Sequence, residues 1–233
     1  MPSSNIHSFI KSSSKPYNFP VYATTSFSMP GTGLLLVDIQ QGLNHPTYWG
    51  TQRSTPNFET NITKLLSSFR ITLDTHILHV CHHSTFESSP LHPSKPGVAF
   101  MDFAAPLPSE AVFSKTTSSP FTENGLEQVI KDLELDVLVV AGLTTAHCVS
   151  TTVRLASNLR VVDHPYGSVI RGGNAGVKGD LVLVSDATAT FSVSIEGREF
   201  DAETVHRVHL ATMKDEFCAI QTTEEVLRRL LGY

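Results

Sequence analysis

Residues 136–152 read DVLVVAGLTTAHCVSTT, an apolar run that leads directly into a polar segment containing a cysteine. The run is apolar at consecutive positions, which is typical of a strand buried on both faces of a parallel sheet. Val149, Val153 and Ala156 then recur at helical spacing, so a helix is predicted after the strand. Cys148 lies where that helix begins. Such a cysteine is either small core filler or a nucleophile at a helix N-terminus.

The same pattern recurs along the chain. Short apolar runs predict strands at 33–38, 75–81, 111–115 and 180–186, with a last short strand at 218–221. Apolar residues at i, i+3, i+4 and i+7 predict helices around 62–69 and 126–133, and a further helix is expected over about 202–217. Thr222 and Glu225 form the pattern of a capping box, which would open a final helix. Strands that alternate with helices predict a doubly wound α/β fold, with a mostly parallel sheet and helices on both faces.

Two segments depart from this alternation. Residues 1–30 are rich in Ser, Pro and Thr and have no sustained period, so they are interpreted as an N-terminal extension. Residues 31–233 are then expected to form one domain, which suits their length. Within that domain, the Gly-rich segment at about 163–179 is interpreted as an inserted loop. Either segment could cover a pocket or join subunits, and a homo-oligomer is expected.

The composition of the chain argues against several classes of partner. The formal charge of −5 and the lack of a basic cluster interleaved with aromatic residues argue against nucleic-acid binding, so no nucleic-acid partner is expected. No apolar run approaches the roughly 18–20 residues of a membrane span, and the N-terminus lacks the apolar core of a signal peptide. The three cysteines are widely spaced, which argues against a disulfide framework or a structural zinc site. A cytoplasmic location is therefore predicted.

Three reactive side chains fall at or just after predicted strand ends. Asp38 ends the first strand, Lys115 ends another, and Cys148 follows the strand within 136–142. Ligands bind outside the carboxyl ends of the strands in such sheets, so these groups are candidates for one site. The helix N-terminus and the lysine are expected to lower the pKa of the thiol. A carboxylate can accept the thiol proton, and free backbone N–H groups before the helix can hold an oxyanion.

Each of these residues also has an ordinary structural interpretation. A lone cysteine in an apolar setting is usually core filler, as expected for Cys81 and Cys218. Asp38 could cap the following turn, and Lys115 could be a solvated charge at a strand end. His147 adjoins the candidate nucleophile, but consecutive helical residues do not face each other, so it is a poor base for that thiol.

The segments that carry these residues resemble the motifs of the isochorismatase-like cysteine hydrolases. The matching segments are 38–40 (DIQ), 113–116 (FSKT), 142–149 (GLTTAHCV) and 185–191 (SDATATF), and the similarity covers about residues 31–222. The resemblance implies a six-stranded, Rossmann-like three-layer sandwich and a catalytic triad of Asp38, Lys115 and Cys148. It also implies a cis peptide bond between Leu143 and Thr144, which would aim the N–H groups of Thr144 and Cys148 at an oxyanion.

The resemblance also bears on metals and cofactors. Members of the nicotinamidase type carry a metal site whose Asp-x-His motif follows the first strand, whereas residues 39–73 contain no Asp and one histidine, His45. His82, His83 and His92 are conceivable ligands, but they lack an accompanying cluster of carboxylates. Neither a metal nor another cofactor is therefore expected.

Within this family a cysteine favours acyl transfer, because members that cleave the enol ether of isochorismate do not all need one. The expected enzyme is a cysteine hydrolase that cleaves a C–N bond of a small amide, ureido or carbamoyl compound through a thioester. Asp38 would deprotonate Cys148 and later protonate the leaving amine, while Lys115 keeps Asp38 ionised. Two alternatives stay open: an isochorismatase-type vinyl ether hydrolase, and a non-catalytic small-molecule binding protein of the same fold.

The substrate pocket is expected in the loops that follow the strands. Its candidate residues are Gln40, Tyr48, Trp49, His82, Phe86, Ser119 and Phe121. An aromatic wall with few polar groups would suit a small, flat substrate. Trp49 and Phe121 could equally be ordinary packing residues. Gln40 could orient Asp38 or satisfy a loop backbone, and Asp186 is expected to hold the turn after its strand.

Overall fold

The computed structural model of the chain describes residues 31–50, 52–163 and 178–231. The predicted N-terminal extension at 1–30 lies outside the described residues. So does most of the predicted inserted loop, of which only residues 163, 178 and 179 are described.

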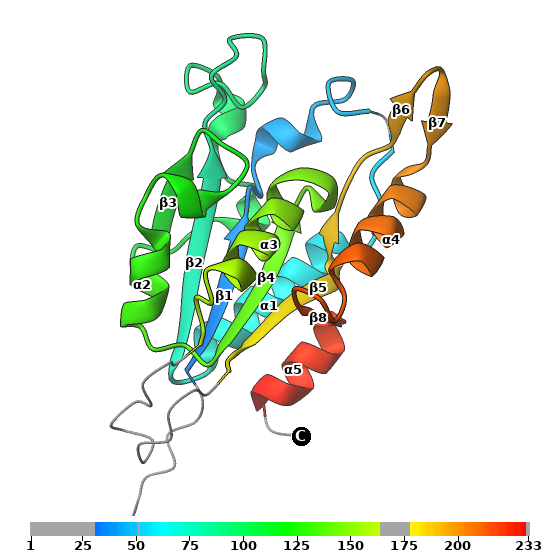
Figure 1. Cartoon of the computed structure of the whole chain (residues 1–233). Coiled ribbons are helices and arrows are strands. Elements are labelled where there is room, and N and C mark those ends of the chain that lie inside the picture. Colours follow the sequence, from blue (N-terminus) through cyan, green and yellow to red (C-terminus); the bar gives the residue numbers. More distant parts are fainter. Residues whose placement is uncertain (1–30, 51, 164–177, 232–233) are drawn as a thin grey trace, which may run out of the picture.

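Six parallel strands form the central sheet, in the order β3-β2-β1-β4-β5-β8 (Figure 1). The strands are β1 (Thr32–Val37), β2 (Thr75–His82), β3 (Ala111–Lys115), β4 (Val137–Leu143), β5 (Asp180–Ala189) and β8 (Ala219–Gln221). The chain runs outward from β1 through β2 to β3, and then returns to β4 on the other side of β1. The strand order therefore reverses between β1 and β4, where a doubly wound sheet opens a crevice at the carboxyl ends of its strands.

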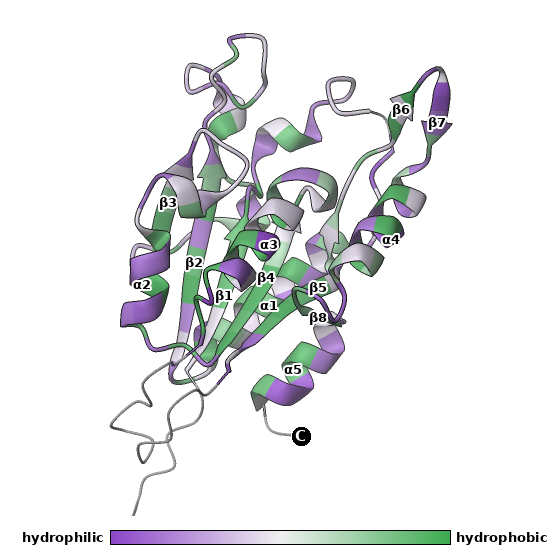
Figure 2. Ribbon diagram, in the orientation of Figure 1, coloured by the Kyte–Doolittle hydropathy of each residue, from purple (hydrophilic) through white to green (hydrophobic). Residues whose placement is uncertain are grey.

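Helices cover both faces of this sheet and complete a three-layer sandwich (Figure 1). On one face lie α1 (Phe58–Ile71) and α5 (Thr223–Leu231), and on the other lie α2 (Leu126–Asp132), α3 (Ser150–Asn158) and α4 (Ala202–Met213). Leu34 and Leu36 of β1 pack toward the first face, whereas Leu35 and Val37 pack toward the second. Figure 2 shows the result, with hydrophobic strands between helices that are polar on their outer sides. The predicted α/β fold is confirmed.

The start of α5 confirms the capping box. The Thr222 amide donates to Glu225 Oε2 at 2.7 Å, and the Glu225 amide donates to Thr222 Oγ1 at 3.3 Å. The expected role of Asp186 in a turn after its strand is wrong, because β5 continues to Ala189 and Asp186 lies inside it. Its carboxylate accepts hydrogen bonds from the amide and hydroxyl of Thr223, so it ties β5 to the start of α5.

Two further local features differ from the prediction. A separate antiparallel hairpin, β6 (Val193–Ile195) and β7 (Arg198–Phe200), was not predicted. The two residues of its turn, Glu196 and Gly197, have φ of 52° and 76°, which is typical of a two-residue hairpin turn. The helix expected over 202–217 ends at Met213, and the left-handed φ of 65° at Asp215 marks the chain leaving the helix.

The chain also contains short turns of helix that connect the main elements. These are η1 (Gln41–Asn44), η2 (Pro96–Val98), η3 (Asp102–Ala104), η4 (Pro120–Thr122) and the π-helical turn η5 (Thr145–Val149). In the part of the chain that the structure describes, no helix is both long enough and apolar enough to cross a bilayer.

Candidate active site

Asp38 directly follows β1, at the centre of the carboxyl edge of the sheet. Its side chain is 2% exposed, and its amide donates to the carbonyl of Val80 on the neighbouring strand. Its φ of 52° lies in the left-handed region, which aspartate tolerates better than most residues. The backbone therefore leaves the strand abruptly at this residue and keeps the carboxylate at the sheet edge.

Gly142 allows β4 to lie close to β1 beside Asp38. A Cβ atom at this position would lie 2.1 Å from the carbonyl oxygen of Val37, and the φ of Gly142 is 131°. The register between β4 and β5 also shifts here, between Val140 and Gly142. A glycine is therefore required where the strand that precedes Cys148 passes the strand that precedes Asp38.

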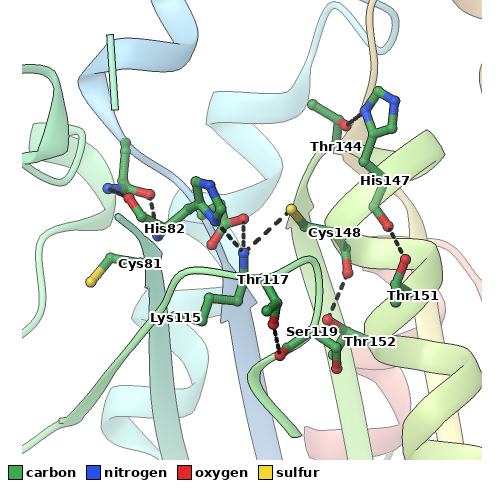
Figure 3. A network of polar contacts seen from close by, with 12 residues as sticks. Cys81, His82, Lys115, Thr117, Ser119, Thr144, His147, Cys148, Thr151 and Thr152 are labelled. Atoms are coloured by element: carbon green, nitrogen blue, oxygen red, sulfur yellow. Dashed lines mark hydrogen bonds and ion pairs between the residues drawn. The ribbon is translucent and has the colours of Figure 1, made fainter. Parts of the chain in front are cut away.

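Lys115 ends β3 and joins the other two predicted site residues. Its Nζ donates to Asp38 Oδ2 at 2.7 Å and to Cys148 Sγ at 3.3 Å, with the lysine itself buried (Figure 3). Burial lowers the pKa of Lys115, but the negative charge of Asp38 and the contacts of the ammonium with Asp38 and with the Cys148 sulfur outweigh burial, so the pKa is raised. Lys115 is thus a buried ammonium in contact with a carboxylate and a sulfur.

Cys148 lies in η5, immediately before α3, as the sequence predicts for a residue near a helix N-terminus. The expected lowering of its pKa is wrong. Burial and the negative charge of Asp38 raise the pKa of the thiol to about 12, although Lys115 opposes them. The resting side chain is therefore a neutral thiol that needs a proton acceptor. Cys81 and Cys218 are buried, as expected of core filler.

One oxygen of Asp38 is available for that proton. Asp38 Oδ2 pairs with Lys115, whereas Oδ1 is buried and accepts no hydrogen bond of good geometry from the described residues. A buried carboxylate oxygen without a donor is costly, and it is a ready acceptor for a proton from the thiol or from a substrate N–H.

The turn from β4 into α3 contains the cis peptide bond between Leu143 and Thr144 that the resemblance implies. The carbonyl of Thr144 accepts hydrogen bonds from the amides of His147 and Val149, both at 3.1 Å. These two donors flank Cys148 in the chain, and the Cys148 amide does not share this acceptor. His147 is exposed, and its Nδ1 lies 3.0 Å from the Thr144 hydroxyl. This contact agrees with the expectation that His147 is a poor base for the Cys148 thiol.

His82, predicted as a pocket residue, lies against the charged groups. Its Nδ1 is 3.2 Å from Lys115 Nζ, and the two residues are partners across the β2–β3 pair. Gln40 is fully buried and holds the backbone of His82: its Oε1 accepts from the His82 amide at 2.7 Å, and its Nε2 donates to the His82 carbonyl at 3.1 Å. The same Nε2 donates to the carbonyl of Val98 at 2.9 Å. Of its two expected roles, Gln40 fulfils that of satisfying loop backbone.

The aromatic residues predicted for the pocket differ in their surroundings. The indole N–H of Trp49 donates to the Gly42 carbonyl at 2.8 Å, and its ring stacks on Phe191 with centroids 6.4 Å apart. Tyr48 packs edge-on against Trp49 and is 44% exposed. Phe86 is 72% exposed in the loop after β2. Trp49 therefore has a packing role, and a pocket role for these three rings stays a prediction.

Ser119 and Phe121 follow Lys115, as predicted, and both support the local backbone. Ser119 is buried, and its Oγ accepts from the Phe121 amide at 3.3 Å at the start of η4. Phe121 is partly buried and packs on the same core cluster that Cys148 packs against. These contacts explain both residues without a substrate, so their pocket role also stays a prediction.

A metal site would need to compete with Lys115. Among the described residues, Asp38, His82 and Cys148 bring possible ligand atoms within 4.8 Å of one another. The ammonium of Lys115 contacts all three side chains, so it already occupies the position that a cation would take. A metal could bind these atoms only if the buried ammonium left.

A cavity of about 160 Å³ lies away from this site, at the opposite end of the sheet. Its lining combines apolar residues, such as Phe69, Val139 and Val226, with polar and charged residues that include Asp74 and Arg229. None of the predicted site residues contributes to its lining. The chemistry therefore points to the carboxyl edge and not to this cavity.

The sequence and the fold agree with one family of known proteins. A family model for the isochorismatase domain matches residues 32–225. The chain belongs to the isochorismatase family. It is accordingly a hydrolase of that family, and the resemblance noted in the sequence is confirmed.

Individual relatives span nearly the whole described chain. The isochorismatase family protein YrdC of Bacillus subtilis is 34% identical over 195 residues, which are 83% of this chain and 93% of YrdC. A proposed hydrolase of the isochorismatase family from Chromobacterium violaceum has a crystal structure with 31% identity and a TM-score of 0.75, covering 89% of this chain and 97% of that one. A cysteine hydrolase from Pseudomonas syringae, at 23% identity, has the same fold, with a TM-score of 0.70 over 87% of this chain and 93% of that one.

Proposed function

We propose that the protein hydrolyses a C–N bond of a small amide, ureido or carbamoyl compound, with Cys148 as nucleophile and a thioester as intermediate. One observation carries the proposal. The buried Lys115 ammonium touches both the Asp38 carboxylate, at 2.7 Å, and the Cys148 sulfur, at 3.3 Å. A nucleophile, a proton acceptor and a positive charge in one crevice are the parts that covalent acyl transfer requires.

In the first half of the reaction the thiol proton moves to Asp38 as the sulfur attacks the substrate carbonyl. Because the pKa of Cys148 is raised to about 12, proton transfer and attack occur together, without an accumulated thiolate. The C–S bond forms, and the carbonyl electron pair moves to oxygen. The amides of Thr144 and Cys148 are the proposed donors to that oxyanion. When the C–N bond breaks, Asp38 returns the proton to the leaving nitrogen.

Water completes the cycle. Asp38 removes a proton from a water molecule that attacks the thioester carbonyl. The C–S bond then breaks, and the sulfur recovers its proton from Asp38. Lys115 remains an ammonium throughout, which its raised pKa supports, and it stabilises negative charge on the carboxylate and the sulfur in turn.

The test is a screen for ammonia released from a panel of small amides, ureido compounds and carbamoyl compounds. Cys148→Ala is expected to lower kcat by at least about 1,000-fold, because no acyl-enzyme can form. Cys218→Ala makes the same chemical change in the core and serves as the matched control. Mass spectrometry of the quenched reaction is expected to detect an acyl adduct on Cys148.

The family name raises the competing activity, cleavage of the vinyl ether of isochorismate, in which Asp38 protonates the substrate directly. Full activity of Cys148→Ala on isochorismate, without ammonia release from any amide, would replace the amidase proposal by this one. Binding of a compound with no turnover and no adduct would replace both by a non-catalytic binding role.

A cytoplasmic, homo-oligomeric state is part of the same proposal. The three cysteines are free thiols, as expected in a reducing compartment. Leu73 and Ile195 leave 87% and 64% of their surface exposed, which a second copy of the chain could cover. Light scattering of the purified protein tests the assembly, and a monomer mass would contradict it. Deletion of residues 167–179 tests whether that segment joins subunits.

A further inference from the structure

The ammonium of Lys115 has three hydrogens and three acceptors. Besides Asp38 Oδ2 and Cys148 Sγ, it lies 3.2 Å from His82 Nδ1 (Figure 3). An ammonium can only donate, so His82 Nδ1 must accept, and the proton of the neutral ring must lie on Nε2. Because Lys115 is 1% exposed, water is poorly placed to replace a lost acceptor.

His82 is held in this position from three directions. Gln40 binds both its backbone N–H and its carbonyl, and pairing of β2 with β3 sets it beside Lys115. The backbone of Thr117, in the segment that follows β3, also lies near enough to the ring to raise its pKa. A residue that merely lined a pocket would not need its main chain fixed by a fully buried glutamine.

We propose that His82 is a positioning residue whose neutral ring holds the Lys115 ammonium between Asp38 and Cys148, and whose protonation switches the site off in acid. A protonated His82 could not accept from Lys115, and it would place a second cation against the ammonium. Lys115 would then move off the carboxylate and the sulfur that the proposed reaction uses. The inference rests on the proposed function of the triad. It attributes the loss of that activity at low pH to protonation of His82.

The charged groups around His82 agree with a neutral ring at pH 7. Burial and the positive charge of Lys115 lower the pKa of His82 below its usual 6.5, whereas Asp38 and Glu123 act in the opposite direction. Asp38 comes from the end of β1, Lys115 from β3, and Glu123 from the exposed segment after η4. Cys148 is a neutral thiol at rest and adds no charge.

Kinetics on two variants test the switch. His82→Asn retains an acceptor near the position of Nδ1 but does not titrate, and His82→Leu removes the acceptor. In the natural chain kcat/KM is expected to fall about tenfold per pH unit below the pKa of His82. For His82→Asn, kcat/KM at pH 7.5 is expected to be about threefold lower than in the natural chain. The decline of kcat/KM in acid (the acid limb of the pH profile) is expected to begin at least about one pH unit lower. For His82→Leu, kcat/KM at pH 7.5 is expected to fall by about 10- to 100-fold.

The neighbouring His83→Asn is the matched control, and its acid limb is expected to coincide with that of the natural chain. An unshifted acid limb in His82→Asn, or equal activity of His82→Asn and His82→Leu, would overturn the inference.

A second measurement needs no substrate. Ring 15N chemical shifts of His82, assigned with His82→Asn, are expected to report a proton on Nε2 and a pKa below 6.5. In Lys115→Met the pKa is expected to rise toward 6.5, and the exposed Lys64→Met is the control. If Lys115→Met does not fold, the double variant Asp38→Asn with Lys115→Met removes both charges together. A pKa of His82 that is the same in Lys115→Met as in the natural chain would overturn the inference. Retained activity of Cys148→Ala would instead overturn the proposed function and leave this result standing.

Discussion

At the scale of single residues, burial and the Asp38 carboxylate raise the pKa of Cys148, and Asp38 is the proposed acceptor of its proton. Asp38→Asn keeps the shape and the tolerance for a left-handed φ but loses both effects. We expect kcat to fall by about 100- to 10,000-fold. The rate of Cys148 alkylation by iodoacetamide at pH 8 is expected to rise, because the thiol pKa falls when the carboxylate charge is removed.

The informative result is that kcat falls in Asp38→Asn while the rate of Cys148 alkylation rises. Asp102→Asn, an exposed aspartate in η3, is expected to change neither. Slower alkylation in Asp38→Asn would mean that the carboxylate does not hold the thiol in its neutral form.

Gly142 is a structural requirement of the same site. Gly142→Ala is expected to lower the free energy of unfolding by at least about 3 kcal/mol, because a Cβ would lie 2.1 Å from the Val37 carbonyl oxygen. Urea denaturation followed by circular dichroism measures the change. Gly125 also has a positive φ, of 72°, but nothing lies within 4 Å of its Cβ position. Gly125→Ala is expected to cost only about 1 kcal/mol, and equal losses at both positions would refute the close-contact explanation.

At the scale of elements, Glu110 ties α1 to the sheet beside β3. It pairs with Arg70 Nε at 2.7 Å and with His79 Nε2 at 2.9 Å, and it accepts from the Leu107 amide at 2.9 Å. Burial raises the pKa of Glu110, but the hydrogen bonds outweigh it and lower the pKa to about 2. Its stabilising contribution is therefore complete above its usual pKa of 4.5 and is lost as the pH falls toward 2.

Glu110→Gln is expected to lower the free energy of unfolding at pH 7 by about 2 kcal/mol, with a smaller difference from the natural chain at pH 3. Urea midpoints at the two pH values provide the measurement. Glu127→Gln removes an exposed i,i+4 pair with Lys131 and is expected to cost less than about 0.5 kcal/mol. A difference that does not shrink in acid would argue against an ionic role for Glu110.

The elements were largely predictable because their apolar periodicity is strong. The strands β1, which Asp38 follows, and β3, which ends at Lys115, were predicted to within one residue. The β6–β7 hairpin was missed because its strands are short and mostly exposed, so no buried face imposes a period on the sequence. The end of α4 was predicted too late because Phe217 continues the apolar pattern, although it packs on the core from outside the helix.

At the scale of the whole molecule, several buried histidines couple stability to pH. Burial lowers the pKa values of His79, His82 and His206 below 6.5, against hydrogen bonds and acidic neighbours that act in the opposite direction. The unfolded chain therefore binds protons at a higher pH than the native chain does. Stability is complete above about pH 6.5 and declines as the pH falls from there toward the native pKa values.

The urea midpoint is accordingly expected to decrease from pH 7.5 to pH 5, at constant ionic strength. His206 bridges the Thr145 hydroxyl and the Ser185 carbonyl, at 2.8 and 3.0 Å, so His206→Gln is expected to reduce part of this pH dependence. A midpoint that is flat over this range would mean that these rings remain uncharged in both states or charged in both.

By itself the sequence determined the fold class, the ends of β1, β3 and β4 to within one residue and the three residues of the candidate triad, because periodicity and position relative to a strand end are local properties. The tertiary structure alone decided which groups touch. His82 meets Lys115 only through the register of β2 with β3, and Gly142 is required only because β4 passes close to β1. It also decided the charge of Cys148: burial and a neighbouring carboxylate outweigh the helix terminus and the lysine, and both depend on residues distant in the chain.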